Sequence, residues 1–256
     1  APAAGASALP AGLMAPHLSA DDGLLSQLTR RGALATRAEL ERLTGLGRLR
    51  EGQDWRCAGA LEHRIRSSRP PALPEAASGG SRPAHPEELA AAHLHPEAAA
   101  VWHPQAGWVK PGALVRAWLS EPGVTFRGNA QVHRLHPLAL TAAAVAPGTP
   151  APQDGTPPAP EARRADRNTA VGWQALSAAG QALAEAPLVV VAAALGSGPL
   201  LEGRLHLQPV RGQVSWGLRG PADPLPPFPV NGSGHLLTAV PLDEGLAWLS
   251  GSSYGH

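Results

Sequence analysis

The sequence predicts a mixed α/β fold, in which helices and a buried parallel strand share the chain with a strand-rich, antiparallel region. The strongest strand signal is the apolar run from Pro187 to Ala194, and uninterrupted runs of this kind are typical of strands buried on both faces of a parallel sheet. Three more strands are expected at 205–216, 234–240 and 246–253. Helices and a parallel strand followed by several strands indicate a nucleotide-binding type of sheet combined with a second, antiparallel domain.

Three helices are expected in the first half of the chain. One begins at Ser19, whose hydroxyl can cap it, and continues to about Leu46, where two glycines follow. Pro86 and Pro111 each open a shorter helix, because proline suits the first helical turn. The helix that Pro86 opens is expected to end near His95.

Four short strands are expected around these helices, at 55–66, 100–104, 107–109 and 123–132. Residues 146–168 are rich in proline and charge, and they indicate an extended insertion without regular structure.

Composition narrows the class of protein. The chain has 256 residues, of which 43% are hydrophobic, so it can bury a core. Cys57 is the single cysteine, which rules out an internal disulfide and fits a reducing cytoplasm. No apolar run approaches the roughly 18 residues that a membrane span needs, and no signal peptide is evident. We therefore expect a cytoplasmic protein without a membrane partner.

The net charge of +1 hides a local excess of positive charge. Residues 30–82 contain 11 arginines against six acidic residues, an excess of five. A solvated charged face is the common explanation of such a segment. A contact surface for a polyanion such as RNA is the alternative, and charge by itself does not decide between them.

Metal chemistry finds no support in the sequence. There is no CxxC, HExxH or P-loop pattern. His93 with His95, and His133 with His136, have no ligand partners at a useful spacing, so we expect surface or capping histidines and no metal.

Four separated segments carry a resemblance to a known family. They are Gly5-Ala6-Ser7 with Gly12-Leu13-Met14-Ala15-Pro16; His103-Pro104-Gln105-Ala106-Gly107-Trp108-Val109-Lys110-Pro111; the run Val189 to Ala194; and Pro209-Val210-Arg211-Gly212-Gln213-Val214-Ser215 with two later segments, Pro229-Val230-Asn231-Gly232 and Leu249-Ser250-Gly251-Ser252-Ser253. In this order the segments resemble the D-amino-acid-oxidase-like flavoproteins, above all the FAD-dependent half of bifunctional tRNA-modification enzymes.

The resemblance implies a partial Rossmann-like FAD-binding domain, at 1–54 and 100–198, interleaved with an antiparallel substrate domain at 55–99 and 199–256. The family opens with a strand, GxGxxG and a helix, and it closes with a glycine-rich flavin loop. Neither is found in these 256 residues, so the chain is expected to be a fragment with a methyltransferase domain upstream.

The resemblance also implies site residues. Contacts with FAD are expected from nine positions: Gly5, Ala6, Ser7, Gly12, Leu13, Met14, Ala193, Gly196 and Gly251. Arg211 is expected to make an electrostatic contact near the flavin or with the substrate carboxylate, because a guanidinium binds carboxylates bidentately. Tyr254 is a second catalytic candidate, and Asn231 and Gly232 are expected to face the substrate. A surface arginine and a packing tyrosine are the alternatives.

The implied reaction is oxidative removal of the carboxymethyl group from 5-carboxymethylaminomethyl-(2-thio)uridine at the tRNA wobble position, with release of glyoxylate. One alternative is an FAD-dependent oxidase of glycine, sarcosine or D-amino acids. The other is an inactive truncated remnant.

Overall fold

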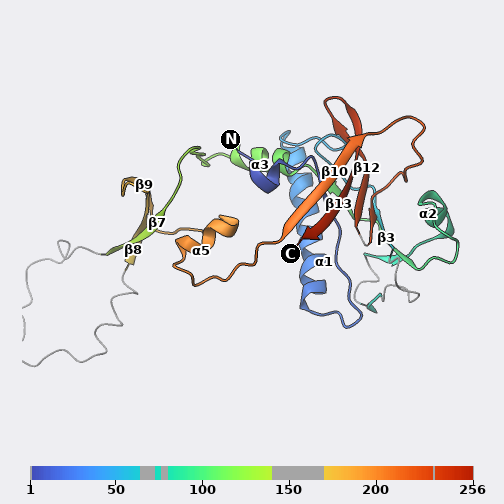
Figure 1. Cartoon of the computed structure of the whole chain (residues 1–256), viewed down its shortest axis with the longest axis horizontal. Coiled ribbons are helices and arrows are strands. Elements are labelled where there is room, and N and C mark those ends of the chain that lie inside the picture. The colour runs from blue at the N-terminus through green and yellow to red at the C-terminus, as the bar shows by residue number, and fades with distance from the viewer. Residues whose placement is uncertain (1, 64–72, 76–79, 140–169, 233, 256) are drawn as a thin grey trace, which may run out of the picture. The chain divides into compact units, whose positions relative to one another are not determined.

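The computed structural model describes residues 2–63, 73–75, 80–139, 170–232 and 234–255. The chain divides into two compact units, each described here by itself (Figure 1). The first unit contains Ala1–Phe126 and Val210–His256, and the second contains Arg127–Pro209. The four-part division into FAD-binding and substrate domains stays a prediction.

A three-stranded antiparallel sheet lies at the centre of the first unit. Its middle strand is β6 (Gly107–Val109), with β1 (Gly12–Met14) on one side and β2 (Trp55–Arg56) on the other. β6 begins with Gly107 because a Cβ at that position would lie only 1.9 Å from the carbonyl oxygen of Arg56. The expected short strand at 107–109 is confirmed.

The first unit also contains a seven-stranded sheet, in the order β10-β13-β12-β11-β3-β5-β4. The β11·β3 ladder is parallel and the other named ladders of this sheet are antiparallel. The strands are β3 (Ala60–His63), β4 (Arg82–Pro83), β5 (Ala100–His103), β10 (Arg211–Leu218), β11 (Val230–Asn231), β12 (His235–Leu242) and β13 (Gly245–Gly255). The three C-terminal strands expected from the sequence are therefore confirmed, although β10 begins six residues later than expected.

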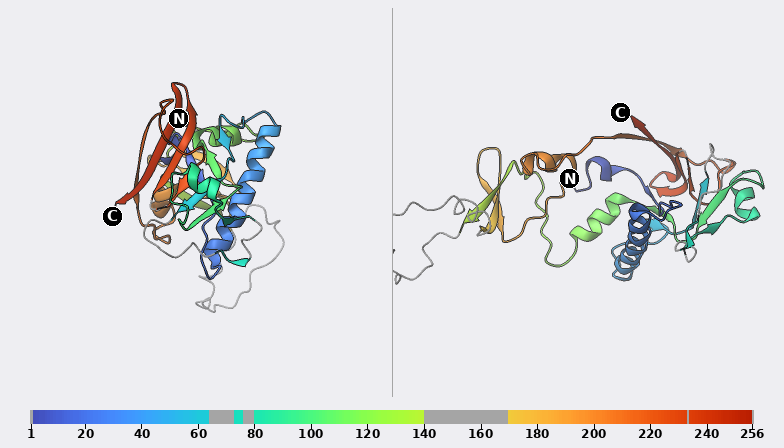
Figure 2. Two further views of the ribbon diagram at one scale, coloured as in Figure 1. Left: turned by 90° about the vertical axis from the view of Figure 1, so that its right-hand side faces the viewer. Right: turned by 90° about the horizontal axis from the view of Figure 1, so that it is seen from below.

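In the described part of the first unit, helices and a 3-10 turn accompany these sheets. They are α1 (Leu24–Gly45), α2 (Pro86–Ala91), α3 (Pro111–Leu119) and the 3-10 helix η1 (Gly5–Ala8). In both views of Figure 2, α1 lies on the opposite side of the first unit from β13. The prolines open α2 and α3 as predicted. Helix α2 ends at Ala91 rather than near His95, and His93 adopts a positive φ of 56°.

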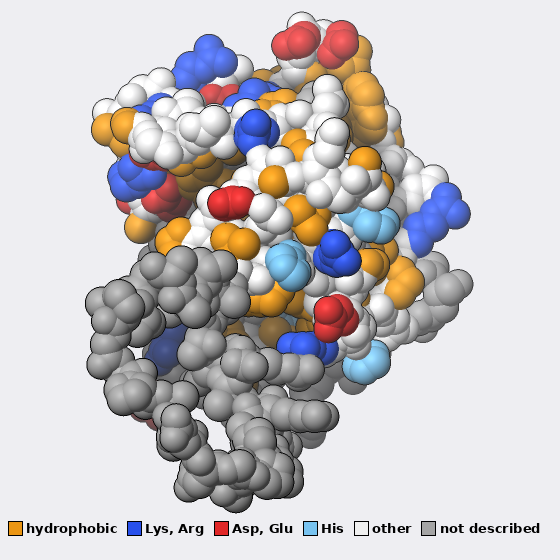
Figure 3. Space-filling model, turned by 90° about the vertical axis from the view of Figure 1, so that its left-hand side faces the viewer, with side chains coloured by type: hydrophobic (Ala, Val, Ile, Leu, Met, Phe, Trp, Pro, Cys, Tyr) orange, Lys and Arg blue, Asp and Glu red, His pale blue; other side chains and the backbone are white. Residues whose placement is uncertain are grey.

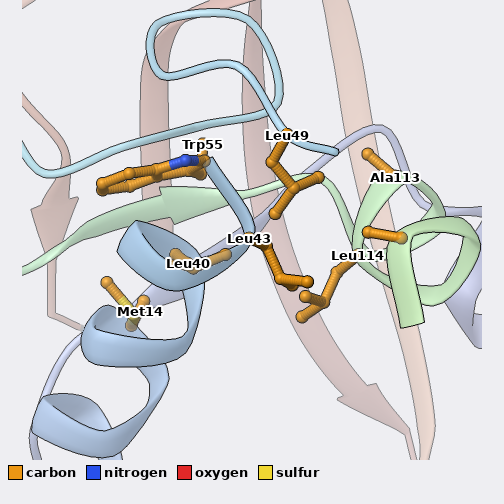
Figure 4. Packing of buried hydrophobic residues seen from close by; sticks show 8 residues of the cluster. Met14, Leu40, Leu43, Leu49, Trp55, Ala113 and Leu114 are labelled. Atoms are coloured by element: carbon orange, nitrogen blue, oxygen red, sulfur yellow. The ribbon is translucent and has the colours of Figure 1, made fainter. Parts of the chain in front are cut away.

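The core of the first unit joins α1 to α3. Leu40 and Leu43 of α1 are fully buried against Leu49, Trp55 and Leu114 (Figure 4). The rest of this cluster is Met14, Ala113 and Ala117. Because β1, the residues after α1, and α3 all contribute, this cluster fixes where the N-terminal loop lies relative to both helices.

Gly59 separates what the sequence predicted as one strand at 55–66. It has a φ of +78°, and a Cβ there would lie 2.1 Å from the indole ring of Trp102. β2 on one side of it pairs with β6, and β3 on the other side pairs with β5. The single strand is therefore wrong, because the chain passes from one sheet to the other at this glycine.

The second unit contains a three-stranded antiparallel sheet, β7 (Arg134–Ala139), β8 (Ala170–Leu176) and β9 (Ala182–Ala186). After it come the 3-10 helix η4 (Ala194–Gly196) and the short helix α5 (Ser197–Leu200). The predicted insertion at 146–168 lies outside the described residues.

Two predicted strands are wrong. Residues 123–132 form no strand, because Gly123 and Asn129 have positive φ values and interrupt an extended backbone. The apolar run from Pro187 to Ala194 pairs with no strand in the described part of the chain. Within this run Leu188 and Val190 are 75% and 80% exposed. Apolarity suggested burial, but a parallel strand needs hydrogen-bonded neighbours on its edges.

The start of α1 also differs from its prediction. The helix begins at Leu24 instead of Ser19, because Asp22 has a φ of +48° and bends the chain just before it. The Ser19 hydroxyl still accepts a hydrogen bond from the Gly23 backbone N–H. It therefore stabilises the turn that precedes the helix.

An ion network connects the C-terminal ends of α1 and α3. Arg42 donates to Glu39 and to Glu121, and Glu121 also pairs with Arg48. The Trp118 indole N–H donates to Glu39 at 2.8 Å. The hydrogen bonds from Arg42 and then Trp118 lower the pKa of Glu39 to about 2.

Among the residues that the structure describes, no helix is long and apolar enough to span a membrane. Within that same part of the chain, no three or more His, Cys, Asp or Glu side chains gather as a metal site.

We expect Leu40→Ala to lower the free energy of unfolding by about 2–5 kcal/mol, because it leaves a cavity in the core that joins α1 to α3. Urea unfolding followed by circular dichroism measures the change. Leu24→Ala, in the same helix but 72% exposed, is the matched control and should change the value by less than about 0.5 kcal/mol. Equal losses in the two variants would contradict this account of the core.

Candidate functional site

The N-terminal loop presents open backbone. Gly5 begins η1 with a φ of +63°, and Gly12 begins β1. A Cβ at either glycine would meet no atom within 4 Å, so a flat group can approach the backbone on these sides. Ser7 of η1 packs against α3, where its carbonyl oxygen lies 3.5 Å from the ideal Cβ position of Gly112. Ala6 lies between Gly5 and Ser7 in the same turn.

Leu13 and Met14 belong to the packing of β1. Met14 is buried in the core with Leu40 and Leu43, and Leu13 packs against the cluster that contains Trp108. Their side chains therefore hold the loop against the protein, and the backbone of β1 is what remains for a cofactor.

Ala193 and Gly196 belong to the second unit, where Ala193 directly precedes η4 and Gly196 ends it. The Ala193 backbone N–H donates to the Ser197 hydroxyl at 3.1 Å. The structure thus places these two predicted FAD contacts in a different unit from Gly5 and Gly12.

Strand register brings Asn231, His235 and Gly251 into one row across three neighbouring strands. Asn231 of β11 pairs with His235 of β12, which pairs with Gly251 of β13. His235 Nδ1 lies 2.7 Å from the Asn231 amide oxygen, so the ring donates this hydrogen bond. Burial lowers the pKa of His235. His235 was not among the residues predicted from the sequence, and its place three residues after Gly232 was the available signal.

Gly232 and Gly251 both lie where backbones approach closely. A Cβ on Gly232 would lie 2.2 Å from the His63 carbonyl oxygen, and one on Gly251 would lie 2.7 Å from that of Gln213. The register of β10 and β13 shifts beside Gly251, between Gln213 and Val214. Strand packing therefore accounts for both glycines.

Arg211 and Tyr254 lie farther along the same pair of strands. Arg211 opposes Gly255, and Gly212 opposes Tyr254, at the end of the β10·β13 ladder. Since Tyr254 is three residues beyond Gly251, a strand rise of about 3.3 Å per residue separates the two by roughly 10 Å. Arg211 is exposed. The two predicted catalytic residues are thus near each other, and apart from the row that contains Asn231.

A cavity of about 560 Å³ lies beside α1, within the size range of small-molecule sites. Pro16, which follows the β1 loop, lines it. Arg30 of its wall donates two hydrogen bonds to the Asp22 carboxylate, the one to Oδ2 at 3.0 Å. The hydrogen bonding from Arg30 lowers the pKa of Asp22. Arg31, Gln27 and Gln105 are the other cationic and amide groups of the wall.

A buried chain of polar side chains begins at the wall of this cavity, which Ser81 and His103 line. Ser81 Oγ lies 2.8 Å from His103 Nδ1, and His103 Nε2 lies 3.2 Å from Glu62 Oε2. All three residues are buried, His103 completely. Both ring nitrogens have partners, so the group crosslinks β3, β5 and the start of β4. This group was not predicted from the sequence, although Glu62 and His103 interrupt otherwise apolar strands.

In the described part of residues 30–82, several arginines are paired with acidic side chains. Arg37, Arg42 and Arg82 form ion pairs with acidic neighbours. Charges of both signs are scattered among apolar side chains on the face drawn in Figure 3. For these arginines the solvated face is the better explanation.

The sequence matches the FAD dependent oxidoreductase family over residues 1–256. The chain belongs to this family. A tRNA 5-methylaminomethyl-2-thiouridine biosynthesis bifunctional protein MnmC from Verminephrobacter eiseniae is 47% identical to it, over 99% of this chain and 38% of the relative. The protein of the same description from Polaromonas naphthalenivorans is 44% identical, over 99% of this chain and 37% of that relative. The chain thus spans little more than a third of these relatives.

Solved structures of flavoprotein oxidases share the fold. Glycine oxidase from Geobacillus kaustophilus superposes with a TM-score of 0.62 at 17% identity, over 98% of this chain and 62% of that one. Iminodiacetate oxidase from Chelativorans sp. BNC1 superposes with a TM-score of 0.56 at 18% identity, over 97% of this chain and 62% of that one. The predicted family and the mixed α/β fold are confirmed.

Membership of this family implies FAD as the cofactor. The residues present fit one edge of such a group, because the backbone at Gly5 and Gly12 is open while the side chains on either side are packed. The individual site residues stay predictions.

We expect Gly12→Ala to fold normally and to weaken FAD binding, because its methyl group would occupy the open side of β1. The flavin absorbance retained after gel filtration, together with the thermal unfolding of the FAD-free protein, measures both effects. Gly107→Ala is the contrasting variant and should unfold more easily, since its Cβ would overlap the Arg56 carbonyl. Full flavin retention in Gly12→Ala would remove β1 from the cofactor site.

Proposed function

We propose that the protein containing this chain oxidises 5-carboxymethylaminomethyl-(2-thio)uridine at the wobble position of tRNA and releases glyoxylate. The similarity to bifunctional tRNA-modification proteins over 99% of the chain carries this proposal. The open backbone of Gly12 beside the packed β6 strand supports it, as a place for the flavin. A methyltransferase domain upstream and action in the cytoplasm are parts of the same proposal.

FAD, when bound, supplies the oxidising power by accepting a hydride from the substrate methylene. The carbon that loses the hydride becomes part of an imine, and water then divides the imine into the aminomethyl-uridine and glyoxylate. This scheme requires a neutral substrate amine and a cation for the substrate carboxylate. Arg211 supplies that cation in our proposal, because its exposed guanidinium stands at the accessible end of the β10·β13 ladder. Tyr254 is proposed to line the same end.

The decisive experiment uses the complete gene product, loaded with FAD, and tRNA that carries the carboxymethylaminomethyl group. We expect glyoxylate to form in an amount equal to the modified nucleoside lost. Glycine, sarcosine and D-alanine are the comparison substrates. Turnover of these free amino acids without reaction on tRNA would replace the proposal with a small-amine oxidase. A product that retains no FAD would favour an inactive remnant.

Arg211→Ala should raise the KM for the modified tRNA about 10-fold or more and leave kcat less affected, because a hydrogen-bonded ion pair with the substrate carboxylate is lost. Steady-state glyoxylate release measures both constants. Arg211→Lys retains the charge, so its KM should lie between those of the original protein and of Arg211→Ala. Arg134→Ala, which removes an exposed arginine of β7, is the control. An unchanged KM in Arg211→Ala would exclude this residue from carboxylate recognition.

A further inference from the structure

A second hollow of about 350 Å³ lies between the residues after α1 and one face of α3. Its α3 side consists of Ala113, Arg116, Ala117 and Ser120. These positions are spaced i, i+3, i+4 and i+7, so they form one stripe of the helix. The two alanines are buried and small, so Arg116 is the one large side chain that α3 contributes to the lining of the hollow.

Two more arginines face this stripe from the opposite wall. Arg48 and Arg50 flank Leu49, whose side chain is buried in the core between α1 and α3. Because Leu49 is buried in the core, the backbone of its neighbours Arg48 and Arg50 is held in place. The turn after it is held by Asp54, which accepts a hydrogen bond from the Arg50 N–H at 2.8 Å.

Positive charge exceeds negative charge in this hollow. Three arginines line it, against one acid, Asp54. The Arg50 side chain is 77% exposed and its Nε lies 3.7 Å from the Asp54 carboxylate, a loose contact. Arg48 pairs with Glu121, but a guanidinium has five N–H donors, so one such pair leaves others available.

We infer that the hollow formed by Arg48, Arg50 and Arg116 holds a backbone phosphate of bound tRNA. Guanidinium groups match the geometry of phosphate oxygens, and the phosphate–sugar backbone accepts at least about half of the hydrogen bonds in protein–DNA complexes. Besides the arginines, the hollow is lined by small residues such as Gly47, Ala113 and Ala117, which leave space for a phosphodiester group that enters from a larger molecule. The inference rests on the proposed function, since tRNA is the substrate there.

Binding of unmodified tRNA to the FAD-loaded protein, measured by fluorescence anisotropy over a series of salt concentrations, tests the inference. The test variant is Arg50→Ala/Arg116→Ala; Arg48 stays because it is paired with Glu121. We expect about 10-fold weaker binding at low salt, and a slope of log K against log salt reduced by about 1. Arg50→Lys/Arg116→Lys, which keeps the charge, should retain most of the slope.

Arg134→Ala/Arg204→Ala removes the same charge from exposed positions elsewhere and should keep the slope of the original protein. An unchanged slope in the test variant, or an equal reduction in this control, would overturn the inference while leaving the proposed function intact. If the original protein binds no tRNA, both the inference about the hollow and the proposed function are overturned. Competition by millimolar inorganic phosphate as strong as that by tRNA would assign the hollow to a free anion instead.

Discussion

The position of β6 is the constraint on which the first unit depends. This three-residue strand pairs with β1 on one edge and β2 on the other, and its first residue touches the Arg56 backbone so closely that only glycine fits. β1 carries the loop that is proposed to meet the flavin, and Trp55 of β2 belongs to the core with α1 and α3. Hydrogen bonds to one short strand thus connect the candidate cofactor loop to the main core.

The two hollows of the first unit differ in chemistry because different kinds of residue form their walls. The larger one is lined by the buried Ser81 and His103, which bond to each other, and His103 also bonds to the buried Glu62. The smaller one is lined by alanines and by three arginines, whose charges are only partly matched by acidic neighbours. Fixed polar groups favour a rigid wall, whereas unmatched guanidinium groups favour an anionic ligand.

The local elements could be predicted where the signal is in the backbone chemistry of nearby residues. Pro86 and Pro111 open their helices as expected, and the strands near 211–218, 235–242 and 245–255 follow their apolar patterns. Prediction failed for the apolar run after Pro187, since whether such a run is buried depends on partners elsewhere in the chain. It failed again at Gly59, because the indole of Trp102 comes from a distant strand.

The sequence by itself determined the family, the mixed α/β class and the glycine-rich loop, because these depend on residue types in a fixed order along the chain. Tertiary structure alone decided that Asn231, His235 and Gly251 share a row, that Glu62, His103 and Ser81 meet, and that three arginines surround one hollow. These groups come together through strand register and helix packing. Both depend on contacts between residues that are far apart in the sequence.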